Sequence, residues 1–544
     1  MQQGPRLNSA HTSGNSSEVK RALISVSDKT GVADFAKALE GLGIEIISTG
    51  GTSRFLVQSG VHVREISDFT GFPEILNGRV KTLHPKVHGS ILFRRNNEED
   101  RKIVEALGLE QIDLVAVNLY PFEEVTKRQG VDLEEAVENI DIGGPALIRS
   151  AAKNYRSLTV VVDPHDYDPL LEELREKGAI SSDTRFRLMK KAFRRTALYD
   201  SAIEAFFEKV SQPTRSSSLD QEFPERLMIQ FDKIQDLRYG ENPHQRAAVY
   251  KDPASPICIA DAKQLSGKKQ LGYNNILDAD AAYSLIREFR GEIASIIIKH
   301  TNPCGGAIGD TLLESLLKAL QTDPVSAYGG VYAFSSKVDI GIARELSNHF
   351  MDVILAPGYE PEALELLSQK KNCRILDITE LLRINGGFSG TKEFRSVLGG
   401  MLYQEPDEAA FDPDMIIVPT SRKPNDTEIK AALFGLKFVK HVKSNAITLT
   451  TPKQLLGVGA GQMSRVDSCK LAIQKAREAG SNPAGSAMAS DAFLPFRDVV
   501  DVAAEAGVSV IIQPGGSIRD DEIVKAADEK GLAMMLTGRR SFRH

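Results

Sequence analysis

A lysine and a histidine stand side by side where an apolar run, residues 294–298, ends. The run is typical of a buried strand, and Lys299 and His300 follow it directly, ahead of the Pro- and Gly-containing residues 302–306. Imidazole accepts a proton near neutral pH, and a neighbouring ammonium can stabilise a developing oxyanion. We therefore predict that a Pro/Gly turn at the strand end presents a general base, His300, beside a fixed positive charge, Lys299.

Cys304 lies in the same segment and has three interpretations: a thiol nucleophile, a zinc ligand or a packing residue. The PCxxC pattern of zinc deaminases is absent because residue 307 is alanine, and the chain has no HxE. The other cysteines, Cys258, Cys373 and Cys469, stand at no CxxC spacing, so neither a structural zinc site nor a disulfide framework is indicated. We expect no catalytic metal, and we favour packing over nucleophilic attack for Cys304.

Two loops near the start of the chain, residues 25–30 (SVSDKT) and 48–52 (STGGT), have the composition of phosphate-binding loops. Each follows an apolar run, and ligands of a parallel sheet bind beyond the carboxyl ends of its strands. Adjacent glycines let backbone N–H groups approach an anion, and hydroxyl groups donate further hydrogen bonds. A tight glycine turn before a helix is the structural alternative. Because neither loop reads GxxxxGK[ST], an ATPase is poorly supported.

Residues 78–88, GRVKTLHPKVH, place two cations two positions apart. In an extended segment Arg79 and Lys81 would face the same way and could hold a phosphate together. The alternative is a solvated basic loop.

Residues 139–153 predict a loop that runs into a helix with Pro145 near its first position. Asp141 near Lys153 would join a carboxylate and an ammonium suited to moving protons. A structural ion pair explains the same two residues equally well.

Aromatic and glycine-rich segments occur later in the chain, at residues 237–245, 457–465 and 490–498. The glycine-rich segment, GVGAGQMSR, is not GxGxxG, so a dinucleotide site is weakly supported. Phe493 and Phe496, together with a carboxylate of the same segment, could grip a flat heterocycle, although such aromatic residues are commonly core.

The elements that must position these residues alternate between strands and helices. Apolar runs at residues 22–26 and 44–47 enclose a segment of helical periodicity at residues 30–42, which predicts a right-handed βαβ unit and a parallel sheet. Further strands are expected at residues 114–117, 158–162, 294–298, 353–356 and 508–512. The fold class is therefore α/β in both halves, and the second half is long enough for two subdomains.

Composition limits the class of protein. The 544 residues are 42% hydrophobic and 26% charged with a net charge of −6, which excludes wholesale disorder and argues against nucleic acid as the main partner. No signal peptide and no apolar run of membrane-spanning length is visible, so we expect no membrane partner and a cytoplasmic location. Residues 1–18 are predicted to be a flexible tail, and the Ser-rich residues 211–218 a linker between two domains, 19–218 and 219–544.

Taken together, the motifs resemble one family, the bifunctional purine-biosynthesis enzymes that join aminoimidazole carboxamide ribonucleotide formyltransferase to inosine monophosphate cyclohydrolase. The resemblance runs from about residue 20 to residue 544. The matching segments, in order, are SVSDKTG, GGT, GRVKTLHPKVHG, NLYPF, IDIGGPALIRSAAKN, LRYGENPHQ, IKHTNPCG, APGY, GAGQMSR, SDAFLPFRD and PGGS.

The resemblance implies a function and a fold. The second domain would transfer a formyl group from 10-formyltetrahydrofolate to the ribonucleotide, and the first would close the product into a purine ring. It implies a methylglyoxal synthase-like first domain with a doubly wound parallel sheet, and a second domain of two cytidine deaminase-like α/β subdomains without zinc. It also implies a homodimer whose formyltransferase sites are shared across the interface.

The resemblance assigns roles by motif. For formyl transfer, Lys299 would stabilise the transition state and His300 would accept the proton; for ring closure, Lys153 would transfer protons with Asp141, Tyr120 and Lys81 nearby. Nucleotide contacts are implied for Ser27, Lys29, Thr49, Gly50, Gly51, Arg79, Thr82, Asn118 and Ile142 in the first domain. The corresponding contacts in the second are Arg238, Tyr239, Gly329, Asp352, Asn445, Arg465, Phe493 and Arg540. The folate would lie toward Val466, Asp498, Ser517 and Ile518.

Two alternatives remain open at this stage. The first domain could be a nucleotide-sensing regulatory module that leaves one active site, or the chain could be a zinc deaminase. The chain also departs from the family pattern at its end, where Arg543-His544 stands in place of paired histidines, close to Arg540.

Overall fold

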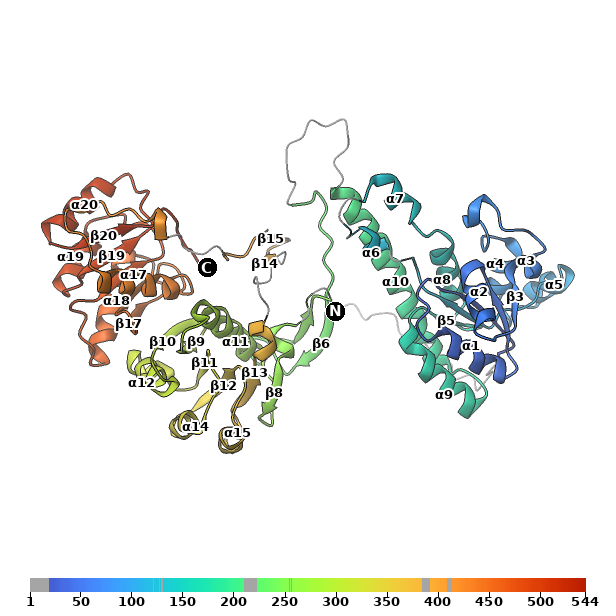
Figure 1. Cartoon of the computed structure of the whole chain (residues 1–544), viewed down its shortest axis with the longest axis horizontal. Helices are drawn as coiled ribbons and strands as arrows, with labels where there is room; N and C mark the ends of the chain where they lie inside the picture. The colour runs from blue at the N-terminus through green and yellow to red at the C-terminus, as the bar shows by residue number, and fades with distance from the viewer. Residues whose placement is uncertain are drawn as a thin grey trace. The chain divides into compact units, whose positions relative to one another are not determined.

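The computed structural model describes residues 19–120, 122–126, 128, 131–209, 223–253, 255, 257–383, 392–408 and 413–544. The chain divides into two compact units, Met1–Ile229 and Gln230–His544 (Figure 1). The predicted tail at residues 1–18 and the predicted domain boundary at residue 218 lie outside the described residues.

The described part of the N-terminal unit is built on a five-stranded sheet in the order β3-β2-β1-β4-β5. The strands are β1 (Arg21–Ser25), β2 (Glu45–Ser48), β3 (Val63–Glu65), β4 (Leu114–Val117) and β5 (Thr159–Val161). Every pairing is parallel, as the strand–helix–strand pattern predicted. The chain winds outward from β1 through β2 to β3 and then crosses to β4. The carboxyl ends of β1 and β4 therefore form the switch point at which doubly wound sheets bind ligands.

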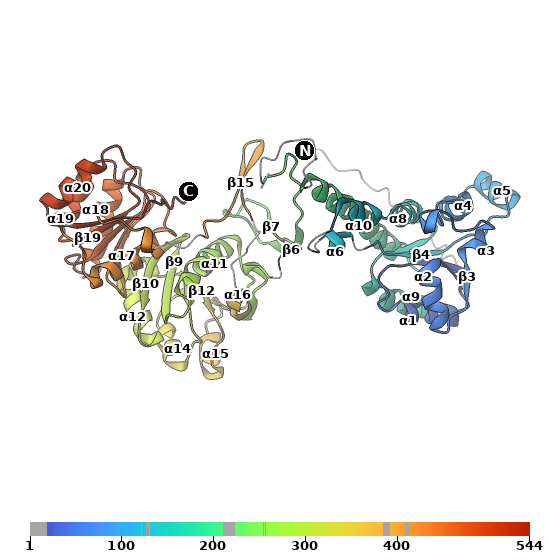
Figure 2. The same ribbon diagram turned by 45° about the horizontal axis from the view of Figure 1, so that its top comes forward.

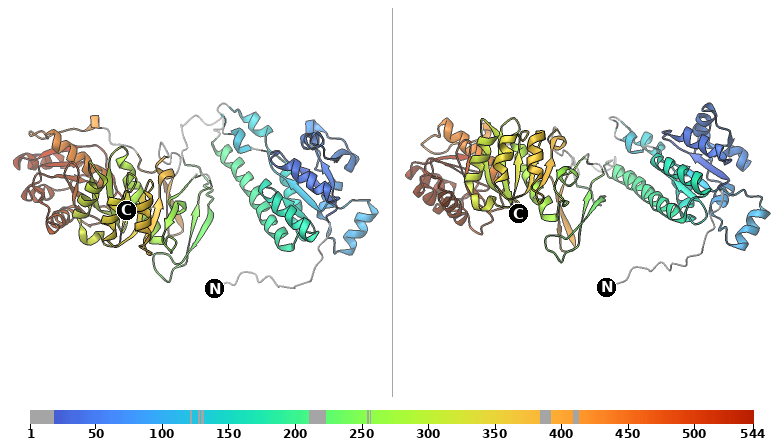
Figure 3. Two further views of the ribbon diagram at one scale, coloured as in Figure 1. Left: turned by 60° about the horizontal axis from the view of Figure 1, so that its bottom comes forward. Right: turned by 90° about the horizontal axis from the view of Figure 1, so that it is seen from below.

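Helices cover both faces of this sheet. They are α1 (Val32–Gly41), α2 (Gly50–Gln58), α3 (Ile66–Thr70), α4 (Pro85–Leu92), α5 (Glu98–Ala106), α6 (Phe122–Thr126), α7 (Leu133–Glu138), α8 (Gly143–Lys153), α9 (Tyr167–Lys177) and α10 (Ser182–Lys209). Ala22 and Ile24 pack into one core and Leu23 into the other, because successive side chains of a strand point to opposite faces. The long helix α10 runs beside α8 (teal in Figure 3) and contributes Tyr199 to the second core.

The C-terminal unit contains two larger sheets of the same design. One has the order β10-β9-β11-β12-β13-β8 and the other β17-β16-β18-β19-β20. In each, two strands form an antiparallel hairpin, the next strand pairs antiparallel with the first strand of that hairpin, and the following strands are parallel to it. The first sheet has in addition β8, antiparallel to β13, at its edge. Figure 2 shows the helices that surround the two sheets. The first sheet comprises β8 (Lys263–Ser266), β9 (Ala294–Lys299), β10 (Asn302–Ile308), β11 (Gly330–Phe334), β12 (Met351–Ala356) and β13 (Arg374–Asp377). The second comprises β16 (Ile447–Thr450), β17 (Leu455–Gly459), β18 (Ala487–Ser490), β19 (Val510–Gln513) and β20 (Ala533–Leu536).

The remaining elements cover these sheets or form small hairpins. The helices are α11 (Tyr273–Ile286), α12 (Leu312–Thr322), α13 (Pro324–Ala327), α14 (Ile340–Ser347), α15 (Pro361–Ser368), α16 (Thr379–Arg383), α17 (Asp426–Val439), α18 (Arg465–Glu478), α19 (Asp498–Glu505) and α20 (Asp520–Glu529). The hairpins pair β6 (Asp232–Leu237) with β7 (Ala247–Lys251) and β14 (Glu393–Val397) with β15 (Gly400–Gln404). Within the described ranges, every helix is too short or too polar to span a lipid bilayer.

Candidate active sites

One amide joins the two loops at the switch point of the N-terminal sheet. The Oδ1 atom of Asn118, which follows β4, accepts hydrogen bonds from the backbone N–H groups of Ser27 (2.5 Å) and Asp28 (3.0 Å). Its Nδ2 atom donates to the carbonyl of Asp28 at 2.9 Å. The sequence-predicted residues Ser27 and Asn118 are therefore brought together at the crevice.

Positive groups gather at the start of α2, beside this crevice. Lys29 donates through Nζ to the hydroxyl of Thr52 (3.1 Å), and burial together with the nearby Lys81 ammonium lowers the pKa of Lys29. The Lys81 ammonium lies 3.8 Å, and a Glu74 carboxylate oxygen 3.7 Å, from the point where a Cβ on Gly50 would stand, so both side chains lie against the first residue of the helix. Thr49 precedes the helix and makes no side-chain cap. Two ammonium groups at a helix N-terminus form an anion-binding arrangement.

The predicted extended arrangement of Arg79 and Lys81 is wrong. Residues Leu76–Gly78 form a single tight helical turn with positive φ angles at Leu76 and Asn77, and Arg79 follows in helical backbone. The two side chains therefore diverge: Arg79 pairs with Glu138, whereas Lys81 reaches α2.

Asp141 lies just before α8, in an environment that raises its pKa above the usual value. Burial raises the pKa of Asp141, while backbone hydrogen bonds from Gly144 (2.7 Å) and Tyr120 and the charge of Lys81 act in the opposite direction. Its own N–H donates to the buried Tyr199 hydroxyl at 2.7 Å. A half-buried carboxyl with a raised pKa near an ammonium is suited to general acid–base work.

The predicted closeness of Asp141 and Lys153 is wrong. Asp141 precedes the first turn of α8 and Lys153 is its last residue, so about 15 Å of helix rise separates them. The cation that acts on Asp141 is Lys81, which comes from the loop before α4. Of the other predicted residues here, Thr82 lies against Gly143, whereas Tyr120 and Ile142 are exposed.

In the C-terminal unit, Lys299 ends β9 and His300 occupies a two-residue hairpin turn with Thr301. Both turn residues have positive φ, 52° and 63°, as type I′ turns require. The predicted Pro/Gly turn is wrong, because Pro303, Gly305 and Gly306 belong to strand β10. The turn nevertheless leaves the His300 side chain exposed.

Lys299 is held by backbone carbonyls from a different part of the sheet. Its Nζ donates to the carbonyls of Tyr328 (2.9 Å) and Gly329 (3.1 Å), just before β11. Asp352, at the amino end of β12, and Asp278, on α11, act electrostatically within the same cluster. Lys299, Gly329 and Asp352 were predicted from the sequence, whereas Asp278 was not, because a lone carboxylate within a helix gives no signal.

Replacing Gly329 by alanine is expected to lower the rate of the chemistry at Lys299 by about 10- to 100-fold. Gly329 has φ 68°, and a Cβ would stand 3.2 Å from the Lys299 ammonium, so the substitution strains the backbone and displaces the cation. The check is kcat, at saturating substrate, of the reaction that the sequence resemblance assigns to this unit, together with thermal unfolding to show that the unit folds. An unchanged kcat would show that the position of Lys299 does not limit the reaction.

A buried polar cluster of the second sheet lies close to this turn. Arg465, the first residue of α18, pairs with Asp491 and donates to the Asn445 side chain at 2.8 Å. Asn302, next to the His300–Thr301 turn, accepts from the backbone N–H of Lys443 at 2.9 Å. The predicted residues Asn445 and Arg465 are therefore brought together, and a hydrogen bond connects the segment before β16 to the turn.

The remaining predicted residues of this unit are partly or fully exposed. Arg238 lies over the ring of Tyr239 after β6, and a hydrogen bond joins Glu241 of the same loop to the start of α11. Phe493 and Phe496 are 41% and 49% exposed, so their interpretation as core residues is wrong. Val466 is the second residue of α18 and Asp498 the first of α19, whereas Ser517 and Ile518 lie between β19 and α20. Asp498 and Ile518 are exposed, and the other two are partly buried. Arg540 is exposed and stacks on Phe542.

Cys304 is enclosed in the core at a bulge of β10. Burial raises the pKa of its thiol to about 12, so a thiolate is scarce at neutral pH. Among the described residues, no three His, Cys, Asp or Glu side chains are grouped so that they could hold a metal ion.

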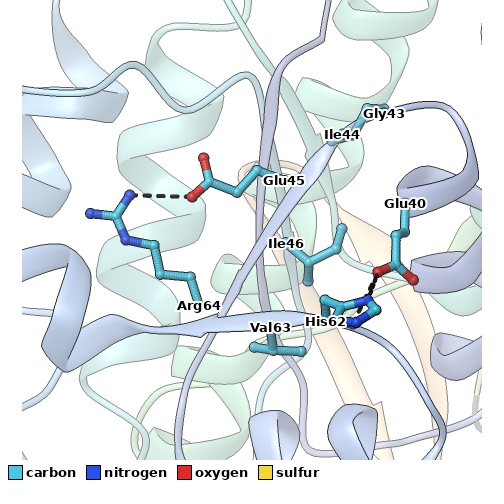
Figure 4. Close-up of a pocket in the computed structure, with 8 residues that line it drawn as sticks. All are labelled: Glu40, Gly43, Ile44, Glu45, Ile46, His62, Val63 and Arg64. Atoms are coloured by element: carbon cyan, nitrogen blue, oxygen red, sulfur yellow. Dashed lines mark hydrogen bonds and ion pairs between the residues drawn. The ribbon is translucent and has the colours of Figure 1, made fainter.

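A separate cavity opens at the amino ends of β2 and β3 (Figure 4). It is lined by Glu40, Gly43, Ile44, Glu45, Ile46, His62, Val63 and Arg64. None of these was predicted from sequence, and the candidate residues lie at the opposite, carboxyl ends of the strands.

Known proteins match this chain over almost its whole length. The family described as "AICARFT/IMPCHase bienzyme" matches residues 151–475, and the "MGS-like domain" matches residues 31–146. Proteins named "Bifunctional purine biosynthesis protein PurH" are 48% identical in Persephonella marina, 49% in Bacillus cytotoxicus and 48% in Thermoanaerobacter sp.. Each alignment covers 96% of this chain and all of the relative. The N-terminal unit thus contains a methylglyoxal synthase-like domain, and the chain belongs to the AICARFT/IMPCHase bienzyme family.

Proposed function

We propose that the two units divide the family's two reactions between them. The chain as a whole is a bifunctional enzyme of purine biosynthesis that performs the last two steps: formylation of aminoimidazole carboxamide ribonucleotide by a folate-bound formyl donor, and ring closure to inosine monophosphate. We assign formyl transfer to the C-terminal unit. The observation that carries this assignment is the exposed His300, presented on a hairpin turn beside the pinned Lys299 and linked to the Asn445–Arg465 cluster.

In the proposed formyl transfer, the nucleotide's exocyclic amine attacks the formyl carbon. An amine attached to an aromatic ring is a weak nucleophile, so His300 removes its proton as the new C–N bond forms. The tetrahedral intermediate carries an oxyanion, which the Lys299 ammonium stabilises; the bond to the folate N10 then breaks, with the proton returned to N10. The carbonyls of Tyr328 and Gly329 hold Lys299 in place for this role.

We propose binding residues for the nucleotide and the folate from their positions in this unit. Arg465 supplies a fixed cation for the nucleotide, with Asn445, Arg238, Tyr239, Gly329, Asp352, Phe493 and Arg540 around it. The segments after β18 and β19, with Asp498, Ser517 and Ile518, and the start of α18, with Val466, would receive the folate. No metal is required by any of these steps.

We assign ring closure to the N-terminal unit. The nucleotide phosphate would lie at the start of α2, among Lys29, Lys81 and the N–H groups of Gly50 and Gly51, with Ser27, Thr49, Arg79, Thr82, Asn118 and Ile142 completing the site. The carboxamide nitrogen attacks the formyl carbon of the same molecule, so positioning supplies much of the rate. Asp141 accepts the amide proton, and the hydroxyl of the resulting adduct departs as water after protonation. Lys81 supports the acid–base work of Asp141, and Lys153 and Tyr120 remain proposed participants.

The regulatory-module alternative is less well supported for this unit. A sensing site needs only to bind, whereas Asp141 combines burial, a raised pKa and a nearby ammonium, a combination typical of acid–base catalysis.

Architecture and assembly complete the proposal. The repeated strand order of the two C-terminal sheets supports two deaminase-like subdomains without zinc. Exposed apolar side chains on β14, β15 and their turn, and Val325, Tyr328 and Phe350 near Lys299, support a homodimer in which a partner covers the site. Sedimentation equilibrium would test the dimer by its mass. We place the enzyme in the cytoplasm with its small-molecule substrates.

The deciding experiment assays both half-reactions on the intact chain. We expect ring closure when the formylated nucleotide is supplied without folate, and formyl transfer when the unformylated nucleotide and 10-formyltetrahydrofolate are supplied together. Absence of ring closure with normal formyl transfer would instead favour the sensing module.

A further inference from the structure

The turn that presents His300 has an unfavourable backbone. Both His300 and Thr301 have positive φ, and Thr301 is β-branched, a class of residue that adopts this conformation rarely. Type I′ turns favour Asn and Gly at these positions because those residues tolerate positive φ. Such a conformation persists only where neighbouring groups hold it.

One side chain from outside the hairpin holds the turn. The Oδ1 atom of Asp278 accepts a hydrogen bond from the backbone N–H of Thr301 at 2.6 Å. Asp278 lies on α11, which packs against the sheet through the fully buried Ala279 and Ala282, so the carboxylate projects from a rigid support. Burial raises the pKa of Asp278, while the hydrogen bond from the Thr301 N–H and the nearby charges of His300 and Lys299 act in the opposite direction.

A second contact restrains the other side of the turn. Asn302 donates through Nδ2 to the His300 carbonyl at 3.0 Å and accepts through Oδ1 from the N–H of Lys443 at 2.9 Å. Asn302 therefore fixes the carbonyl of His300, while Asp278 fixes the N–H of the next residue. Between them, the peptide unit that joins His300 to Thr301 is held from both ends.

We infer that Asp278 is a positioning residue for formyl transfer: it holds the turn in the conformation that aims the His300 imidazole at the reacting amine. Asp278 acts through the backbone and touches neither substrate. The inference rests on the proposed role of His300 and adds a residue that the motifs did not single out.

The test compares Asp278→Ala with Asp278→Asn in the full chain. Alanine removes the acceptor, so we expect kcat for formyl transfer to fall by about 10- to 100-fold, because a displaced base reacts poorly. Asparagine keeps an oxygen that accepts the Thr301 N–H, so we expect its kcat to return to within about fivefold of the native value. KM for the nucleotide should stay within about twofold in both variants, because Arg465 and Asn445 are untouched.

A matched control is Asp310→Asn, which removes a carboxylate beyond the far end of the same hairpin. Asp310 is 83% exposed and pairs only with Lys453 at the surface among the described residues, so its loss should leave kcat unchanged. Calorimetric binding of the unformylated nucleotide, which we assign to the C-terminal unit, reports whether that unit is folded in each variant.

Three outcomes would overturn the inference: a native kcat in Asp278→Ala, a kcat for Asp278→Asn as low as that of alanine, or loss of nucleotide binding in both variants. A native kcat in Asp278→Ala would show that Asp278 has no positioning role. An equally low kcat in Asp278→Asn would assign the loss of activity to the missing charge, and loss of nucleotide binding would assign it to misfolding. His300→Ala, measured in parallel, separates these from failure of the proposed function. If that variant transfers formyl at the native rate, the proposed site itself is wrong.

Discussion

Replacing His300 by alanine is expected to lower formyl transfer by about 10²- to 10⁴-fold while leaving ring closure at its native rate. The reason is that the weakly nucleophilic amine cannot attack effectively unless its proton is removed, and His300 is the exposed base of the β9–β10 turn. Ring closure needs no group from this turn in our assignment. The measurement is kcat for each half-reaction on the same preparation of the intact variant.

Loss of the imidazole must be distinguished from a change in the conformation of the turn. Asparagine tolerates positive φ better than most residues, so His300→Asn removes the base with little change in backbone preference. We therefore expect His300→Asn to be as impaired as His300→Ala. If asparagine retained near-native formyl transfer, the base would have to be another group. Loss of both half-reactions in a folded variant would contradict two independent sites.

Replacing Asp141 by asparagine is expected to reduce ring closure by about 10²- to 10⁴-fold, with formyl transfer unchanged. The amide cannot exchange a proton, although its oxygen still accepts the Gly144 N–H that the carboxylate accepts at 2.7 Å. The loss would therefore report chemistry and not the fold of the loop. The measurement is the rate of ring closure with the formylated nucleotide supplied directly.

The pH dependence of ring closure has a defined sign. Burial raises the pKa of Asp141, and the carboxylate form is the base. The rate in the native protein should therefore fall as pH decreases through that raised pKa, at a higher pH than for an ordinary aspartate. This fall in rate at low pH should be absent from the residual activity of Asp141→Asn. If the substitution left the pH dependence of ring closure unchanged, the fall in rate would have to come from another group.

Lys81→Ala and Lys153→Ala provide the matched comparison. Lys81 lies with Asp141 and α2, whereas Lys153 is exposed at the far end of α8. If Lys153→Ala were the more damaging of the two, the motif-based role of Lys153 would stand, and α8 or its surroundings would have to change position during the reaction.

The sequence predicted the elements that follow from local periodicity. Strand β4 was expected at its observed bounds, and β1, β2 and β9 within one or two residues, because buried parallel and central strands read as short apolar runs. The loops after β1 and β2 were also identified, since ligand groups of such sheets follow the carboxyl ends of strands.

What the sequence could not reveal depends on contacts between distant segments. The turn at His300–Thr301 lacks Asn and Gly, so nothing local indicates a hairpin, and the following Pro303 and glycines suggest a turn where a strand exists. Asp278 becomes visible only when α11 packs over β9. The duplicated strand order of the two C-terminal sheets is likewise a property of topology, without a repeating sequence.

The amide of Asn302 has a consequence for how the two C-terminal sheets work together. One of its atoms binds the residue that carries the imidazole, and another binds the segment leading to the nucleotide anchor. In our assignment, the distance between His300 and the nucleotide-binding residues Asn445 and Arg465 therefore depends on one planar side-chain amide of fixed size. In our assignment, a substitution that displaces the segment before β16 is therefore expected to displace His300 as well.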